Sequence, residues 1–233
     1  MNRDQVRQLI RDVAIIPAVR LSSAEDAHFA TDAVASGGIP IVEITMTVPG
    51  AVELIAHLRD HHVKTLVGAG TVLDVETAAR CIDAGASFLT APELFLPLVE
   101  FAAKRNIAVI PGALTPTEVT TAWRAGADFV KVFPCAPVGG EKYIKALHTA
   151  LPQIPLIAAG GVNQQNAASV ILAGATAVGI GTDLIPSEAV KRHQAKRIQE
   201  LAHRFAGFVA DARHQLEAAR AAEAGAASGH HKT

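Results

Sequence analysis

Aromatic residues and cysteines are both scarce in this sequence of 233 residues. Aromatic side chains make up 4% of the chain, whereas hydrophobic residues make up 50%, with Ala, Val, Ile and Leu abundant. That mixture is more typical of parallel strands buried on both faces than of an antiparallel sandwich. The two cysteines, Cys81 and Cys135, cannot build a disulfide framework, so we expect a protein of the reducing cytoplasm.

Strong charge and long hydrophobic runs are missing as well. The formal net charge is −1, so we expect no basic surface for nucleic acid or for an anionic membrane. The apolar run near the first residues is short and is interrupted by Pro17. It shows no secretory cleavage pattern, and no segment is long enough to cross a bilayer. We therefore expect neither a nucleic-acid partner nor a membrane partner.

Short glycine joints recur along the chain. Three read Ala-Gly-Ala, at 84–86, 125–127 and 173–175, and a looser Ser-Gly-Gly stands at 36–38. Each follows a helical pattern and precedes a strand-like run, and its glycine suits the left-handed conformation at a helix C-terminus. The units between them complete a set of eight predicted strands, at 13–20, 40–46, 64–69, 87–91, 107–111, 128–133, 155–159 and 176–181. Eight alternations favour an α/β TIM (β/α)8 barrel, with a doubly wound sheet as the alternative.

The barrel is predicted to be one domain. It covers residues 1–205 and includes an N-terminal helix near 2–11. Residues 206–233 are predicted to form a C-terminal helical extension, helical to about residue 223, and a frayed Ala-rich tail. The His230-His231 pair in that tail is interpreted as tail rather than as a metal site.

Two helix starts carry capping-box spacing. One runs from Ser22 to Glu25 and the other from Thr115 to Glu118, with Pro116 at the first helical position. A hydroxyl followed three residues later by a glutamate can satisfy two backbone N–H groups of the first turn. We expect helices to begin at both places.

Polar side chains are expected at the C-terminal ends of the strands, where TIM barrels carry their chemistry. Side chains alternate across a strand. In the run FVKVFP, Val130 and Val132 would therefore face the helices, and Lys131 and Phe133 would face the barrel. The same parity in the second predicted strand turns Glu43 inward.

An amine and a carboxylate in one apolar interior allow two interpretations. Lys131 and Glu43 could form a buried structural ion pair, although such pairs are a poor way to stabilise a core. Alternatively, desolvation lowers the pKa of the lysine and leaves a nucleophilic amine, which suits Schiff-base formation with a carbonyl substrate. Glu43 is then the candidate for moving protons.

Two glycine-containing loops follow the seventh and eighth strands. They contain Gly160-Gly161 and Gly181-Thr182. Loops at these places commonly bind phosphate in TIM barrels, because glycine lets backbone N–H groups approach an anion. We expect a phosphorylated small-molecule substrate.

Neither a metal nor another cofactor is expected. None of the ten histidines falls at the C-terminal end of a predicted strand, and no His and carboxylate cluster has the spacing of metal ligands. Cys135 lies just past Lys131 but has no histidine base beside it, so we interpret it as a packing residue rather than a nucleophile.

At these same residues the sequence resembles the 2-keto-3-deoxy-6-phosphogluconate (KDPG) and 4-hydroxy-2-oxoglutarate (KHG) aldolases, a class I family. The resemblance covers residues 13 to about 205. The matching segments are AVR at 18–20, VEITMTVPGA at 42–51, VGAGTVL at 67–73, IPGALTPTE at 110–118, VKVFP at 130–134, KAL at 145–147, AGGVN at 159–163 and AVGIGTDL at 177–184.

The resemblance implies a TIM-barrel homotrimer that needs no cofactor. Lys131 matches the Schiff-base lysine, Glu43 the acid/base glutamate, Thr71 the threonine near the substrate carboxylate and Phe133 the aromatic beside the lysine. The implied phosphate loops are Gly160, Gly161, Gly181 and Thr182. The implied reaction is reversible cleavage of KDPG into pyruvate and glyceraldehyde 3-phosphate.

Several positions depart from the common family pattern. Thr47 stands where some relatives have an arginine, so the carboxylate contact is assigned to Arg20, at the end of the first strand. The fourth strand ends TAPE where Ser-Pro is common, and Pro92 is kept as a substrate contact. Ala159 replaces a threonine that helps read hydroxyl configuration, and phosphogalactonate-cleaving relatives also lack it.

Substrate and even catalysis therefore stay open at the level of sequence. The substrate is the phosphogluconate form, its galactonate epimer, or hydroxyoxoglutarate, which would give pyruvate and glyoxylate. A barrel that binds a phosphorylated ligand without catalysis, or a sugar-phosphate epimerase, would use the same glycine loops without a Schiff base.

Overall fold

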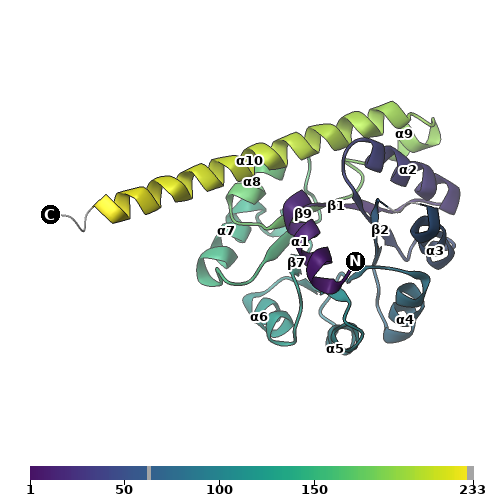
Figure 1. Cartoon of the computed structure of the whole chain (residues 1–233), viewed down its shortest axis with the longest axis horizontal. Helices are drawn as coiled ribbons and strands as arrows, with labels where there is room; N and C mark the ends of the chain where they lie inside the picture. Colours follow the sequence, from purple (N-terminus) through teal and green to yellow (C-terminus); the bar gives the residue numbers. More distant parts are fainter. Residues whose placement is uncertain (62–63, 230–233) are drawn as a thin grey trace.

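Parallel strands and surrounding helices form a barrel in the computed structural model, which describes residues 1–61 and 64–229, with side chains to residue 222 (Figure 1). Among these residues the strands are β1 (Ile15–Val19), β2 (Ile41–Thr45), β3 (Leu66–Gly70), β4 (Phe88–Thr90), β5 (Ala108–Ile110), β6 (Gly112–Ala113), β7 (Val130–Val132), β8 (Leu156–Ala159) and β9 (Ala177–Ile180). All are parallel, in the order β5-β4-β3-β2-β1-β9-β8-β7-β6. The TIM barrel is confirmed.

Strands β5 and β6 are two pieces of the predicted fifth strand, divided at Pro111. Proline has no N–H to donate to a neighbouring strand. Its carbonyl still accepts from Lys131 N at 2.9 Å, and Val109 O accepts from Asp128 N at 3.0 Å. These bonds join the β5–β6 side to β7 and close the barrel.

Helices surround this sheet. They are α1 (Arg3–Val13), α2 (Ala24–Ser36), α3 (Ala51–His61), α4 (Val75–Ala84), α5 (Leu96–Lys104), α6 (Pro116–Arg124), the 3-10 helix η1 (Ala136–Val138), α7 (Glu141–Ala150), α8 (Ala167–Leu172), α9 (Ser187–Lys191) and α10 (Ala195–Gly229). The capping box at Thr115 is present, with Glu118 accepting from Thr115 N at 2.7 Å. The box predicted at Ser22 is wrong by one residue, because Ser23 caps α2 by accepting from Asp26 N at 3.1 Å.

The long helix α10 packs against α2 and α8 and then continues past the barrel (Figure 1). Its inner face is anchored by Ile198, Phe205 and Val209, all buried. The expected boundary at 205 falls inside this one helix, which runs beyond 223 to Gly229. The expected fraying of the last residues and the His230-His231 pair lie outside the described residues. In the described part of the chain, no helix is long and apolar enough to cross a membrane.

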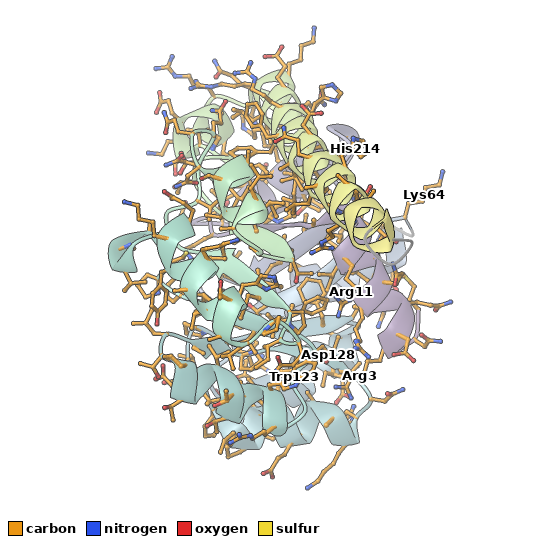
Figure 2. All side chains as sticks on the ribbon, turned by 90° about the vertical axis from the view of Figure 1, so that its left-hand side faces the viewer. Arg3, Arg11, Lys64, Trp123, Asp128 and His214 are labelled. Atoms are coloured by element: carbon orange, nitrogen blue, oxygen red, sulfur yellow. The ribbon has the colours of Figure 1, made fainter. Side chains whose placement is uncertain are left out.

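An ion pair ties α1 to the end of the barrel opposite the strand C-termini (Figure 2). Asp128, just before β7, is 3% exposed. Its carboxylate accepts from Arg3 Nε at 2.9 Å and Nη2 at 3.0 Å, and from the backbone N of Val109 at 2.8 Å. One buried carboxylate therefore links α1, β5 and the segment that enters β7.

Replacing Asp128 with Ala should lower the free energy of unfolding by about 3 kcal/mol, because it removes the charged partner of the Arg3 guanidinium and leaves the buried N–H of Val109 without its acceptor. Denaturant unfolding measures this. Asp60→Ala is the matched control, since Asp60 accepts two bonds from Arg59 at 2.7 and 3.1 Å at an exposed site. Equal losses in the two variants would show that burial of the Asp128 pair is not what matters.

Candidate active site

A cavity of about 290 Å³ opens at the C-terminal ends of the strands. Charged and polar side chains meet apolar ones and glycines in its wall. Its lining consists of Ile16, Ala18, Arg20, Glu43, Thr90, Ile110, Lys131, Phe133, Ile157, Ala159, Gly160, Gly161, Val162, Gly179, Gly181, Thr182, Asp183 and Ile185. The wall combines an amine, a guanidinium and two carboxylates.

Lys131 reaches this cavity from the middle of β7. Its neighbours Val130 and Val132 are fully buried, whereas Lys131 is half-buried and lines the cavity. Its Nζ lies 5.4 Å from the centroid of the Phe133 ring, within range of a cation–π contact. The prediction that Lys131 faces the barrel interior is therefore consistent with its position, and its side chain is open to the cavity.

Glu43 reaches the same cavity from β2. It is 4% exposed, and its carboxylate lies against the backbone of Gly70 on β3. A Cβ atom at Gly70 would come within 2.0 Å of Glu43 Oε1, so any side chain there would displace the Glu43 carboxylate. Among the residues that the structure describes, no ion pair joins Glu43 to Lys131. The interpretation of the two residues as a buried structural ion pair therefore lacks its main support.

Arg20 and Thr71 meet at the rim. Arg20, an exposed side chain at the end of β1, donates from Nη2 to Thr71 Oγ1 at 3.3 Å. Thr71 has a φ of 58°, a left-handed conformation that turns the chain sharply after β3. Arg20 lines the cavity, whereas Thr71 lies outside the lining that the described residues define and contacts Arg20.

Two other predicted contacts lie farther out. The hydroxyl of Thr47 is 2.7 Å from that of Thr45, and Thr47 is exposed beside Arg20 in a shallow neighbouring pocket. Pro92 packs with its carbonyl against Gly112, where a Cβ would come within 2.2 Å of that oxygen. Both residues lie outside the lining of the cavity as the described residues define it.

The loop after β8 has a backbone that glycine makes possible. Gly160 and Gly161 have φ values of 82° and 87°. A Cβ at Gly161 would lie 2.4 Å from that of Ala136. The carbonyls of this loop accept from Ala136 N and from Asn166 Nδ2, both at 2.9 Å, so the loop is fixed on the cavity side. Gly181 and Thr182 follow β9 beside it in the lining.

Known proteins resemble this chain along most of its length. The family model Aldolase, KDPG and KHG aldolase, matches residues 6–201. The chain belongs to this aldolase family. The 2-dehydro-3-deoxy-phosphogluconate aldolase of Pseudomonas aeruginosa is 30% identical over 197 residues, 84% of this chain and 90% of its own length. A 2-dehydro-3-deoxy-6-phosphogalactonate aldolase of Escherichia coli is 35% identical over 172 residues, 73% of this chain and 83% of its own.

A solved relative agrees in structure as well. The KDPG aldolase from Legionella pneumophila, whose crystal structure captured pyruvate as a covalent carbinolamine intermediate, has a TM-score of 0.79 at 30% identity and covers 84% of this chain and 96% of its own. The protein is therefore an aldolase, a lyase on a TIM barrel.

The aldolase cavity contains polar residues that the sequence did not single out. Thr90 ends β4 and Asp183 follows Thr182, and both line the wall. Inward parity in β4 could have indicated Thr90, because Phe88 and Thr90 alternate with Leu89. The strand has only three residues, too few for that alternation to be recognised in the sequence.

Cys135 lies behind the cavity, 1% exposed. Burial, with the charge of Glu141, raises the pKa of its thiol to about 11. Burial likewise raises the pKa of Cys81 to about 11. Both thiols stay protonated near neutral pH, which agrees with packing roles. In the described residues, no three His, Cys, Asp or Glu side chains gather as metal ligands.

Both thiols of the folded aldolase should resist alkylation at pH 8. With a pKa of about 11, roughly one thiol in a thousand is ionised there, and the thiolate is the reactive form. Iodoacetamide labelling followed by mass spectrometry should be at least about 100-fold slower in the folded than in the urea-unfolded protein. Rapid labelling of Cys135 in the folded protein would reopen its role as a nucleophile.

Proposed function

We propose that the chain is a class I aldolase that reversibly cleaves KDPG to pyruvate and glyceraldehyde 3-phosphate through a Schiff base on Lys131. The observation that carries this is the placement of the Lys131 amine and the Glu43 carboxylate in one cavity, with no ion pair between them in the described structure. An unpaired amine is available for attack on a carbonyl, and an unpaired carboxylate can exchange protons.

The proposed chemistry uses these two groups in turn. Lys131 Nζ adds to the C2 ketone to form a carbinolamine, which loses its C2 oxygen as water to give an iminium. The C3–C4 bond then breaks: its electron pair moves toward the iminium nitrogen, and the C4 hydroxyl loses its proton to Glu43 as the aldehyde forms. Protonation of the enamine at C3 and hydrolysis release pyruvate and restore the lysine.

Other cavity residues would hold the two ends of the substrate. Arg20, steadied by its bond to Thr71, suits the C1 carboxylate, and Thr47 lies beside it at the rim. The loops with Gly160, Gly161, Gly181 and Thr182 suit the phosphate. Phe133 packs near the Lys131 amine, while Pro92 shapes the wall through Gly112.

One observation favours a second substrate, the 2-keto-3-deoxy-6-phosphogalactonate epimer. Ala159 lines the cavity directly before the glycine loop, where a threonine hydroxyl would help to distinguish sugar hydroxyl configurations. The Escherichia coli galactonate relative shares 35% identity with this chain. Cleavage rates of KDPG, its galactonate epimer and 4-hydroxy-2-oxoglutarate, compared at equal enzyme concentration, rank the three substrates.

We extend the proposal to assembly and compartment. Family membership supports a homotrimer, which light scattering on the purified chain tests. The two free, buried cysteines support a reducing compartment such as the cytoplasm.

Incubation with pyruvate and borohydride should add a reduced pyruvate to Lys131, because only an imine can be trapped this way. Mass spectrometry of the intact and digested protein locates the adduct. Lys131→Ala should carry no adduct and should not cleave substrate, whereas the exposed-lysine control Lys145→Ala should behave as the unsubstituted protein does. A folded protein that traps nothing would instead indicate a binding barrel or an epimerase.

Glu43→Gln should lower the rate of cleavage by about 10² to 10⁴, the usual contribution of a positioned proton carrier. The amide keeps the shape that fits against Gly70 but cannot accept a proton. Steady-state kinetics gives kcat, and a melting curve checks folding. An unchanged kcat in a folded variant would indicate that water or Thr71, rather than Glu43, carries the protons.

A further inference from the structure

The hydroxyl of Thr90 is buried without a hydrogen-bond partner. Thr90 is 1% exposed, and its Oγ1 is one of the few buried side-chain atoms in the described residues that bonds to nothing. Its backbone is paired, since Thr90 O accepts from Val72 N at 3.1 Å. Burial of an unsatisfied hydroxyl costs free energy, so its presence calls for an explanation.

Other buried threonines of the barrel behave differently. Thr31 Oγ1 donates to Ala27 O at 2.8 Å, and Thr45 Oγ1 donates to Val19 O at 3.1 Å. Thr45, which like Thr90 is in a strand, thus finds a carbonyl of the neighbouring strand as its partner. Thr90 instead lines the cavity, where a bound molecule would be its partner.

Strand order places Thr90 between the two reactive groups. From Glu43 on β2, the barrel passes through β3 and β4 to the β5–β6 pair and then to Lys131 on β7. On β3, Gly68 and Gly70 carry no side chain, and the Glu43 carboxylate occupies the place that a Cβ at Gly70 would take. No β3 side chain therefore separates Glu43 from Thr90. On the other side, the register partner of Thr90 is Ile110, which offers no polar atom.

The two ends of the substrate restrict which atom Thr90 could meet. The glycine loops suited to phosphate follow β8 and β9, on the other side of the barrel from β4. A substrate with its phosphate there and its C2 at Lys131 directs its pyruvate half toward β2, β3 and β4. Arg20, on β1, is assigned to the C1 carboxylate, and the C2 oxygen is the acceptor in that half that lies at the carbon attacked by Lys131.

We propose that Thr90 contacts the substrate, donating its hydroxyl to the C2 oxygen that leaves as water when the Lys131 imine forms. This role rests on the proposed Schiff-base function. In that step the Nζ–C2 bond becomes a double bond and the C2–O bond breaks. The C2 oxygen departs as water after it takes a proton from Glu43. The Thr90 hydroxyl holds that oxygen in position through a hydrogen bond and keeps its own proton.

The test compares Thr90→Val, which keeps the shape and removes the hydroxyl, with Thr90→Ser, which keeps the hydroxyl. Two rates report the imine without cleavage: borohydride trapping of pyruvate on Lys131, and exchange of the pyruvate methyl protons in D₂O followed by NMR. Thr90→Val should slow both by about 10- to 100-fold, and Thr90→Ser should restore them to within about threefold. Melting temperature should not fall in Thr90→Val, because the hydroxyl has no partner to lose.

Three results would count against the role. Unchanged trapping and exchange in Thr90→Val, with normal trapping by the unsubstituted protein, would remove Thr90 from the reaction. A large drop in melting temperature for Thr90→Val would show a structural partner for the hydroxyl. If the unsubstituted protein traps no pyruvate, the proposed Schiff-base function itself fails, and the role of Thr90 falls with it.

Discussion

The interior of this barrel depends on two positions of β3 that have no side chain. A Cβ at Gly68 would lie 2.3 Å from the Phe88 ring, and one at Gly70 would lie 2.0 Å from Glu43 Oε1. Because the centre of an eight-stranded barrel is only wide enough for its own side chains, a large inward side chain needs a neighbouring position that has none. The Phe88 ring occupies the space at Gly68, and the Glu43 carboxylate occupies the space at Gly70. The two glycines thus make room for both side chains.

At the opposite end of the barrel, a buried charge is paired. There, the buried Asp128 carboxylate joins Arg3 of α1 to the backbone of β5 through hydrogen bonds. At the catalytic end, Lys131 and Glu43 are not paired with each other, and Thr90 Oγ1 has no partner in the described structure. Only two residues separate Asp128 from Lys131. Along one short segment the chain passes from a buried charge paired with Arg3 to a charge that faces the cavity without an ion-pair partner in the described structure.

Most of this arrangement could be predicted from the sequence, because side chains alternate along strands and because the polar residues lie at predicted strand ends. Alternation of Val130, Lys131 and Val132 gave the inward lysine, and all eight predicted strands exist. Details that depend on local geometry could not be obtained this way. Ser22 and Ser23 are the same type of residue, and only the backbone conformation shows that Ser23 is the N-cap. β4 is too short to reveal that Thr90 faces inward.

Substrate contacts beyond the strand ends were the hardest to place, for a physical reason. Within a strand, parity fixes the direction of a side chain, but after the last ladder bond each φ and ψ redirects the chain. Thr71, at φ 58°, accepts from Arg20 and lies outside the cavity lining that the described residues define. Matching segments identify such residues without their directions. The directions of residues beyond the strand ends are therefore set by loop geometry, whereas those of Lys131 and Glu43 are set by strand parity.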